Sequence, residues 1–230
     1  MSLNKGVMMM AKKTTSGGEQ NVLISAGGRK LYRHESGMGT VIEFNDGQDR
    51  KVLVLDAAYR TKAMMVGYSS TDSILPNYAG SNTNGTWYID GSNSSTSPSV
   101  CESLVDSTLN SLWVNHIDAN TSRYNTDVWL TMTGCDAATH CRSITVDGVG
   151  CDIPNFQTVQ RIYCEAVNLD ALDPTVAEYS SYALGDWFNS SSLTTSSEYN
   201  NSSIRIVQSS GFCISGTKNS NYGVVPILEL

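Results

Sequence analysis

The chain ends in Tyr222-Gly-Val-Val-Pro-Ile-Leu-Glu-Leu230, an apolar run that decides the fold. Chain termini normally fray unless they are tied into a sheet. The sequence therefore predicts an interior strand over Val224–Leu230. A polar segment, Thr194-Thr-Ser-Ser-Glu-Tyr-Asn-Asn-Ser-Ser203, lies upstream of this run and alternates with other β-prone stretches. Strands are expected at Leu193–Glu198, Ser203–Gln208, Phe212–Ser215 and Gly223–Leu228.

Two helices are predicted further upstream. Apolar residues recur at helical spacing over Phe156–Val167, after Ile153-Pro154. A second helix is expected over Val100–Ile117, because Ser99 and Glu102 form a capping box at its start. Between these helices, the pattern favours a turn at Asn120–Tyr124 and an extended segment at Asp127–Thr133.

The N-terminal third predicts a small β meander. Four short β-prone runs are separated by glycine-containing turns that are typical of hairpins. These runs are Val22–Ser25, Lys30–Arg33, Thr40–Phe44 and Lys51–Asp56. Residues 1–20 contain few bulky apolar side chains and are expected to form a flexible arm. The expected organisation is an arm (1–20), a meander that serves assembly or attachment (21–60), and a main domain (61–230).

Composition limits the class of protein. Only 16% of the residues are charged, and Gly, Ser, Asn and Thr are plentiful, which favours loop-rich β structure over a helical bundle. Together with the two predicted helices, the β-prone runs indicate the α+β class. The net charge is −7 and the cationic residues are scattered, so a nucleic-acid partner is not expected. No apolar run is long enough to insert into a membrane. The N-terminal residues lack the apolar core of a secretion signal, so synthesis and retention in a cytoplasm are expected, with the six cysteines as thiols.

Residues 151–230 resemble the C-type-lectin-like domains of phage and bacterial surface proteins, a group that includes phage tropism determinants and relatives of the formylglycine-generating enzyme. The matching residues are Ile153-Pro154, the helix at 156–167, Ser196-Ser197-Glu198-Tyr199, Arg205-Ile206-Val207, Gly211, and Asn221-Tyr222-Gly223-Val224-Val225-Pro226. In this family, the strand carries the motif W-S-S-T-E and the domain ends in the motif V-R-P. Here Thr195 replaces the tryptophan and Val225 replaces the arginine. The resemblance implies two helices flanking a loop-rich antiparallel sheet.

Three groups of residues have side chains that could bind a metal or act as a nucleophile, and each group also has a purely structural explanation. Cys135, His140, Cys141 and Cys151 are zinc-ligand types, but without a C-x2-C pair they are expected to be small buried residues or at most an opportunistic disulfide. Cys164 and Cys213 occupy apolar settings that disfavour a nucleophile. A lectin calcium site needs an acidic residue that Ile153-Pro154-Asn155 lacks. We therefore expect no catalytic residue, no metal and no cofactor.

A recognition surface is the remaining interpretation. Polar turns rich in Tyr, Asn and Ser resemble the composition of antibody binding loops, although any β protein has turns of this make-up. The resemblance favours recognition, because such domains present this segment on an exposed face. The expected ligand-binding residues are Tyr199, Asn200, Asn201, Ser203, Asn219, Asn221 and Tyr222, with Trp87 and Tyr88 in a separate loop.

The resemblance leads to a functional expectation. A recognition fold without an export signal suits a phage particle, which is assembled in the host cytoplasm and released by lysis. We expect a homo-oligomeric virion component, a tail, head-fibre or capsid appendage, that contacts other virion proteins and a glycan or protein receptor on a bacterium. The alternatives are a bacterial surface or pilus-tip adhesin and an enzyme of the formylglycine-generating type.

The resemblance also implies a set of variable positions. Phage tropism determinants of this fold can be diversified by a retroelement that rewrites adenines and produces Asn, Ser, Tyr and Thr at surface positions. Residues 199–203 and 219–222 have this make-up. Tyr199 and Tyr222 are then expected to be exposed aromatic anchors, whereas Arg205, Val207 and Pro226 would hold the scaffold.

Overall fold

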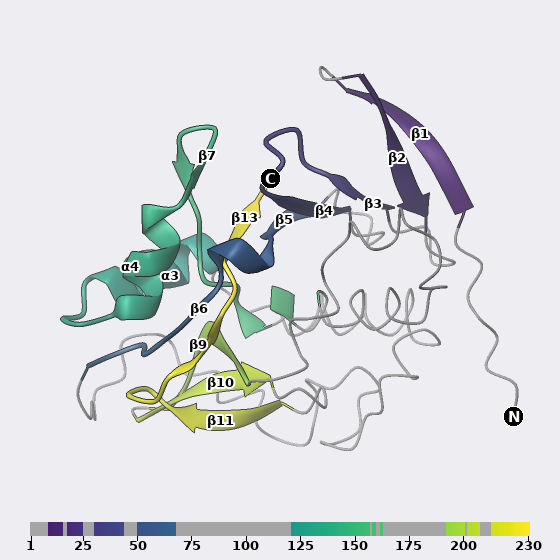
Figure 1. Ribbon diagram of the computed structural model, residues 1–230. Helices are drawn as coiled ribbons and strands as arrows, with labels where there is room; N and C mark the ends of the chain where they lie inside the picture. The colour runs from purple at the N-terminus through teal and green to yellow at the C-terminus, as the bar shows by residue number, and fades with distance from the viewer. Residues whose placement is uncertain are drawn as a thin grey trace, which may run out of the picture.

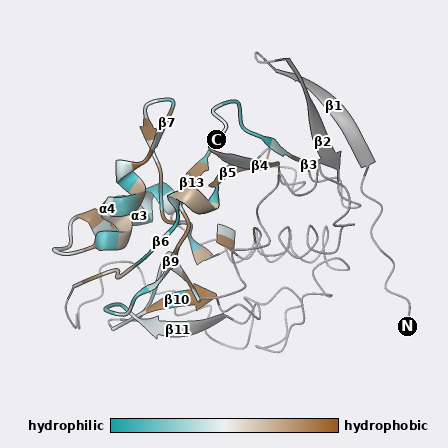
Figure 2. Ribbon diagram, viewed as in Figure 1, coloured by the Kyte–Doolittle hydropathy of each residue, from teal (hydrophilic) through white to brown (hydrophobic). Residues whose placement is uncertain are grey.

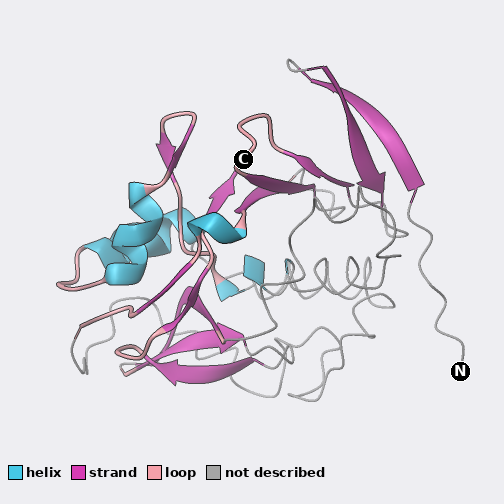
Figure 3. Cartoon of the chain, viewed as in Figure 1, coloured by secondary structure: helices cyan, strands magenta, loops and turns pink. Residues whose placement is uncertain are grey.

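The computed structural model describes residues 9–15, 18–24, 30–43, 50–67, 121–156, 158–159, 162, 192–200, 202–207 and 213–230. Within these residues the chain is α+β, as the pattern of predicted helices and strands indicated. Two large sheets are flanked on one side by the α-helices α3 and α4 (Figures 1 and 3). The predicted helix over Val100–Ile117 and the Trp87-Tyr88 loop lie outside the described residues.

The first sheet has six antiparallel strands, and the predicted meander forms most of it. Its order is β1 (Met9–Thr15), β2 (Gly18–Ile24), β3 (Lys30–Arg33), β4 (Gly39–Glu43), β5 (Lys51–Leu55) and β13 (Ile227–Glu229). Every residue of β5 after Lys51 is buried, so the sheet contributes a continuous apolar layer to the core. At Gly39 a Cβ atom would lie 2.1 Å from the Val54 carbonyl oxygen, so only glycine allows β4 to approach β5 this closely.

Residues 1–20 were predicted to form a flexible arm, and half of them lie in strands. β1 and β2 form an antiparallel hairpin with seven registered pairs, from Met9 opposite Ile24 to Thr15 opposite Gly18. The prediction failed because it required bulky apolar side chains for a strand. A hairpin at a sheet edge is held by backbone hydrogen bonds and needs little side-chain burial.

The second sheet has five strands in the order β11 (Cys213–Thr217), β10 (Ser203–Val207), β9 (Leu193–Asn200), β12 (Tyr222–Val224) and β6 (Thr61–Ala63). These strands confirm the β segments predicted near 193–198, 203–208 and 212–215. β12 pairs with β9 in parallel and with β6 antiparallel, and the other pairs are antiparallel. Apolar residues are concentrated along β10 and β13 (Figure 2).

The C-terminal run is not the single interior strand that was predicted. It divides into β12, which is interior to the five-stranded sheet, and β13, which is the edge of the six-stranded sheet. Pro226 separates them, because proline cannot donate a ladder hydrogen bond. Its carbonyl oxygen instead accepts a bond from Leu55 N at 3.1 Å. The last nine residues therefore connect both sheets, and the pairing of β13 with β5 links the meander to the C-terminal region.

Helix α3 (Ser122–Leu130) replaces both the turn predicted at Asn120–Tyr124 and the extended segment at Asp127–Thr133. Thr121 caps the helix, since its side chain accepts a bond from Tyr124 N. The buried face of α3 consists of Ser122, Asn125, Thr126 and Trp129. Three of these residues are polar, so hydrophobic periodicity could not reveal the helix.

Helix α4 (Asp136–Ser143) was not predicted, because the segment reads as a cysteine-containing loop. It buries Ala137, Ala138 and Cys141. The hairpin of β7 (Thr145–Val146) and β8 (Val149–Gly150) follows, with Asp147 and Gly148 as its turn. Both turn residues have positive φ, +50° and +82°, as a two-residue hairpin turn of this type requires.

Two apolar clusters form the described core. One lies between the five-stranded sheet and the helices, and it contains Met65, Trp129, Cys141, Ile153, Ile204, Ile206 and Val224. The other joins the six-stranded sheet to the β7–β8 hairpin, and it contains Tyr32, Val41, Leu53, Leu55, Val146, Cys151 and Leu228. In the helix predicted over Phe156–Val167, the described residues Phe156, Thr158, Val159 and Ile162 are helical and buried.

Candidate functional site

Two polar turns that are distant in sequence meet at one end of the five-stranded sheet. Ser203 pairs with Asn200 on one side and with Thr217 on the other. Lys218 N donates a bond of 3.2 Å to Ser202 O, which ties the two turns together. The exposed residues here are Ser202, Thr217, Asn219 and Asn221, which we call the turn cluster.

The turn from Thr217 to Tyr222 is held by several hydrogen bonds. The hydroxyls of Thr217 and Ser220 share a bond of 2.6 Å. Ser220 N donates to Thr217 O at 3.3 Å. The Lys218 carbonyl oxygen accepts bonds from both Met65 N and Val66 N, at 3.0 and 3.1 Å. The turn is thereby fixed to the segment after β6, and the exposed side chains project from a rigid base.

A buried ion pair lies directly beneath this turn. Lys218 Nζ contacts Glu198 Oε1, and the two side chains are only 2% and 0% exposed. The ammonium also lies 5.5 Å from the centroid of the Trp129 ring, which favours a cation. Because each charge is removed from water, each depends on the other for compensation.

Strand β9 is a scaffold whose polar side chains are buried and satisfied internally. Trp129 Nε1 donates to Ser196 O at 2.8 Å. Thr195 Oγ1 donates to Arg205 O at 2.8 Å, and Ser197 Oγ accepts from Phe156 N at 2.9 Å. The Ser196-Ser197-Glu198 motif thus connects the sheet to α3 and to the start of the helix predicted over Phe156–Val167. It has a structural role here, beneath the turn cluster.

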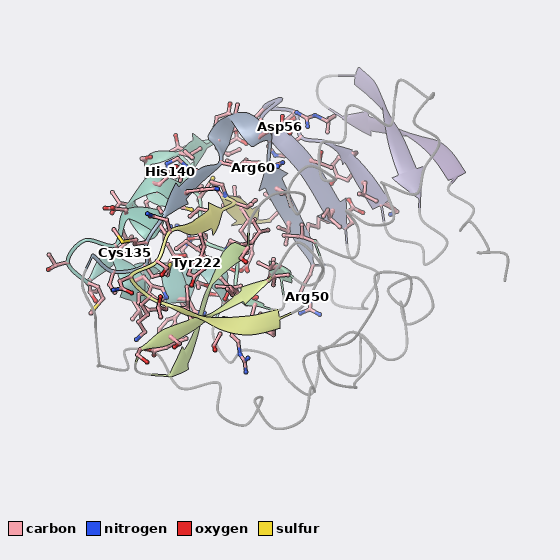
Figure 4. The ribbon with its side chains drawn as sticks, turned by 60° about the horizontal axis from the view of Figure 1, so that its bottom comes forward. Arg50, Asp56, Arg60, Cys135, His140 and Tyr222 are labelled. Carbon is pink, nitrogen blue, oxygen red and sulfur yellow. The ribbon has the colours of Figure 1, made fainter. Side chains whose placement is uncertain are left out.

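Tyr222 is half-buried and does not have the free exposure expected of an aromatic anchor. It packs against the apolar cluster that also contains Cys135 (Figure 4). Its hydroxyl lies so close to Gly216 that an added Cβ would be 2.5 Å from the oxygen. The Tyr222→Ala change would therefore remove packing between β12 and β11 as well as any contact to a ligand. This position is a poor choice for testing recognition alone.

The other predicted site residues fall into three groups. Asn219 and Asn221 are exposed and Ser203 is half-buried, and all three belong to the converging turns. Tyr199 and Asn200 are the last two residues of β9, and the structure describes their backbone. Asn201, Trp87 and Tyr88 lie outside the described residues. Sequence reasoning missed Lys218 and Trp129, because a single lysine in a turn and a tryptophan in an apparent strand carry no distinguishing pattern.

The three candidate zinc-binding cysteines are buried free thiols: Cys135, Cys141 and Cys151. Burial was expected for Cys135 and Cys141. Burial raises the pKa of Cys135 and of Cys151 to about 11, and it raises the pKa of Cys141 well above its usual range. A protonated thiol is a poor nucleophile and a poor metal ligand. His140 Nε2 lies 2.7 Å from Tyr59 O (Figure 4). Within the described residues, no group of three His, Cys, Asp or Glu side chains is placed to hold a metal ion.

A second charged cluster connects the helices to the C-terminal strand. The Asp152 carboxylate is buried, with Arg123 Nε at 3.1 Å and Arg142 Nη2 at 3.0 Å. Arg142 also contacts Asp127. The Asp152 backbone exchanges two hydrogen bonds with Ile227, of 2.8 and 3.0 Å. Burial raises the pKa of Asp152 to about 7; Arg123 opposes this shift, and Glu229 and Asp127 add to it.

This raised pKa predicts a pH dependence of stability. Between about pH 4 and pH 7 the folded chain retains a proton on Asp152 that the unfolded chain has lost, so the contribution of Asp152 to the free energy of unfolding falls as pH rises. Each pKa unit corresponds to about 1.4 kcal/mol. Urea unfolding at pH 4.5 to 7.5 should show that the free energy of unfolding of the wild type exceeds that of Asp152→Asn by an amount that decreases as pH rises. The exposed Asp127→Asn is the matched control and should show a smaller dependence. If this difference in free energy increases with pH instead, the ion pairs with Arg123 and Arg142 have a larger effect on the pKa of Asp152 than its burial.

Comparisons with known proteins assign no family. No family model matches the chain, and no curated protein and no solved structure matches it at the significance required. Among the described residues, none of the helices has the length and apolar character needed to cross a membrane.

Proposed function

We propose that this chain is a receptor-binding appendage of a phage particle, which displays a C-type-lectin-like domain to recognise the surface of a bacterium. The observation that carries the proposal is the convergence of two polar turns on a rigid base. Ser202, Thr217, Asn219 and Asn221 supply neutral hydrogen-bonding groups at one exposed end of a sheet. Beneath them, the ion pair of Lys218 with Glu198 is buried.

Pre-organisation is the physical reason why such an arrangement suits binding. A ligand that meets a turn already fixed by hydrogen bonds does not have to order it, and this lowers the entropic cost of association. The turn cluster offers hydroxyls and amides without an exposed ionic group of its own. Such groups match the hydroxyl-rich surface of a glycan or a polar protein epitope. Several copies on one particle would increase the avidity of weak single contacts.

The lectin-like fold is proposed on the topology of the described residues. Strand β12 pairs with β6, so the C-terminal part of residues 61–230 returns to the strand at its start, and β13 pairs with β5 of the meander. The Ile153-Pro154 segment leads into helical residues at Phe156, Thr158 and Val159. These features agree with a sheet whose ends pair and which is flanked by helices.

Particle labelling tests the location. Antibodies against this chain should label tails or capsids in negative-stain images of purified virions. Particles that contain no such protein by labelling and by mass spectrometry would contradict the proposal. A bacterial adhesin would instead be found on cells without any phage infection.

Recognition is tested with the turn cluster. Particles carrying Asn219→Ala together with Asn221→Ala should adsorb to host cells about tenfold more slowly or worse, because each lost amide removes hydrogen bonds to the receptor. Thr145→Ala, an exposed polar change on β7, is the matched control and should adsorb normally. Both variants should melt at the wild-type temperature. Unchanged adsorption of the double variant would move the site away from the turn cluster.

A further inference from the structure

The C-terminal strand β13 lies between the helices and β5 of the six-stranded sheet (Figure 1). On one side it pairs with β5 over its full length. On the other side, Ile227 exchanges two backbone hydrogen bonds with Asp152, of 2.8 and 3.0 Å. Glu229 Oε1 accepts a bond of 3.3 Å from the backbone N of Ser122, the first residue of α3. The docking of β13 against the helices therefore depends on the residues around Asp152.

Charged side chains from three elements act on the Asp152 carboxylate, which is 1% exposed. Arg123 of α3 and Arg142 of α4 contact it at 3.1 and 3.0 Å. Arg142 also contacts Asp127, and the charges of Asp127 and Glu229 both disfavour ionisation of Asp152. We call these five side chains the Asp152 cluster: Arg123, Asp127, Arg142, Asp152 and Glu229.

Other titratable groups near the cluster do not change its charge. The thiols of Cys141 and Cys151 also interact with Asp152, and burial raises the pKa of both, so they stay protonated and neutral near pH 7. From β5, Lys51 offers its carbonyl oxygen to Leu230 N at 3.0 Å. Its ammonium is paired with Glu43 at 3.6 Å.

The Asp152 cluster contains more acidic than basic groups. Three carboxyl groups face two guanidinium groups, so one negative charge is in excess when every group is ionised. One bound proton removes this excess. Burial penalises the charged form of a carboxyl group, so the most buried of the three retains the proton. Asp127 is 59% exposed and Glu229 is half-buried, whereas Asp152 is removed from water and its pKa is raised to about 7.

We propose that the Asp152 cluster is a proton-binding site that controls the docking of β13 against the helices. With one proton bound, the cluster is electrically balanced and β13 stays docked. When the proton leaves, two buried or half-buried carboxylates, those of Asp152 and Glu229, repel each other across this contact, and the bridge between Asp152 and Ile227 opens more often. This control does not depend on the proposed receptor binding.

The contact of β13 with the helices is expected to loosen as pH rises. When the bridge opens and water reaches Asp152, the pKa of its carboxyl group returns toward the ordinary value of 3.8, whereas the docked form holds its proton up to about pH 7. Docking is therefore strongest below about pH 4, weakens between about pH 4 and pH 7, and changes little above that range. One proton changes the opening constant by at most about tenfold for each pH unit.

Amide hydrogen exchange of the full chain, followed by NMR between pH 5 and pH 8, tests the proposal. The reporting amides are those of Asp152 and Ile227, and the amides of Ile204–Val207 in β10 are the internal reference. After correction for the intrinsic effect of pH on exchange, the reporting amides should exchange about tenfold faster or more, relative to β10, at pH 7 than at pH 5. Above pH 7 the ratio should level off.

Three variants assign the effect to the cluster. Asp152→Asn keeps the shape and removes the titration, so the ratio should be the same at every pH. Glu229→Gln keeps an oxygen acceptor for Ser122 N and leaves equal numbers of carboxyl and guanidinium groups, so the rise should become smaller and move to lower pH. Glu43→Gln removes a half-buried carboxylate of β4 outside the cluster, and it should reproduce the wild-type profile.

Several results would overturn the proposal. One is a wild-type ratio that does not change with pH, or that falls as pH rises. Another is a rise that persists unchanged in Asp152→Asn, because the proton would then be bound elsewhere. If Asp152→Asn does not fold, the comparison of Glu229→Gln with Glu43→Gln decides, and identical profiles for these two variants would contradict control by the cluster.

Discussion

Breaking the ion pair of Lys218 and Glu198 from one side should destabilise the chain by about 3–5 kcal/mol, because the remaining buried charge loses the opposite charge beside it. Lys218→Met removes the ammonium from the buried Glu198 carboxylate. Glu198→Gln removes the carboxylate from the Lys218 ammonium, which lies 5.5 Å from the centroid of the Trp129 ring. Urea unfolding monitored by tryptophan fluorescence measures the loss, and Trp129 lies next to the site.

A double replacement separates the charge effect from simple loss of packing. Lys218→Met with Glu198→Leu removes both charges and keeps apolar volume, and it should recover most of the stability lost in either single variant. Lys30→Met is the matched control at the surface. Lys30 is 51% exposed and lies 3.4 Å from Glu43, so its loss should cost less than about 1 kcal/mol. Equal effects of Lys218→Met and Lys30→Met would show that the buried pair contributes no more than an exposed one.

Val225→Asp should prevent folding of the chain, since it places an unpaired carboxylate where the last residues cross between the two sheets. Val225 is 3% exposed and lies between β12 and β13, next to Pro226. An ionised side chain there would be removed from water, which costs several kcal/mol or forces the segment open. Because β12 and β13 belong to different sheets, opening this segment would detach the C-terminal residues from both sheets.

The expected result is an insoluble or unfolded product, seen as loss of the cooperative thermal transition. Val149→Asp makes the same chemical change at a residue that is 45% exposed in the β7–β8 hairpin, and it should fold normally. Val225→Thr keeps the shape and adds one hydroxyl, so it should reduce stability without abolishing folding. A Val225→Asp variant that melts like wild type would show that this crossing does not carry the fold.

The sequence by itself determined the features that depend on local chemistry. Glycine-containing turns and β-branched runs placed the meander strands within a residue or two of β3, β4 and β5. Asp147-Gly148 specified its hairpin turn because few residue pairs accept two positive φ angles. The α+β class and the β-rich C-terminal region followed from composition and alternation. The candidate site residues Asn219 and Asn221 were identified as polar turn residues, which they are.

Only the tertiary structure decided what depends on packing between distant segments. Helix α3 has a largely polar buried face, so its burial comes from hydrogen bonds to β9 that no periodicity reveals. The C-terminal run divides between two sheets because Pro226 interrupts it where two sets of strands compete for pairing. Lys218 is buried only because Glu198, twenty residues away, lies beneath the same turn. A charged residue is expected at the surface unless a partner is brought to it, and the fold alone supplies that partner.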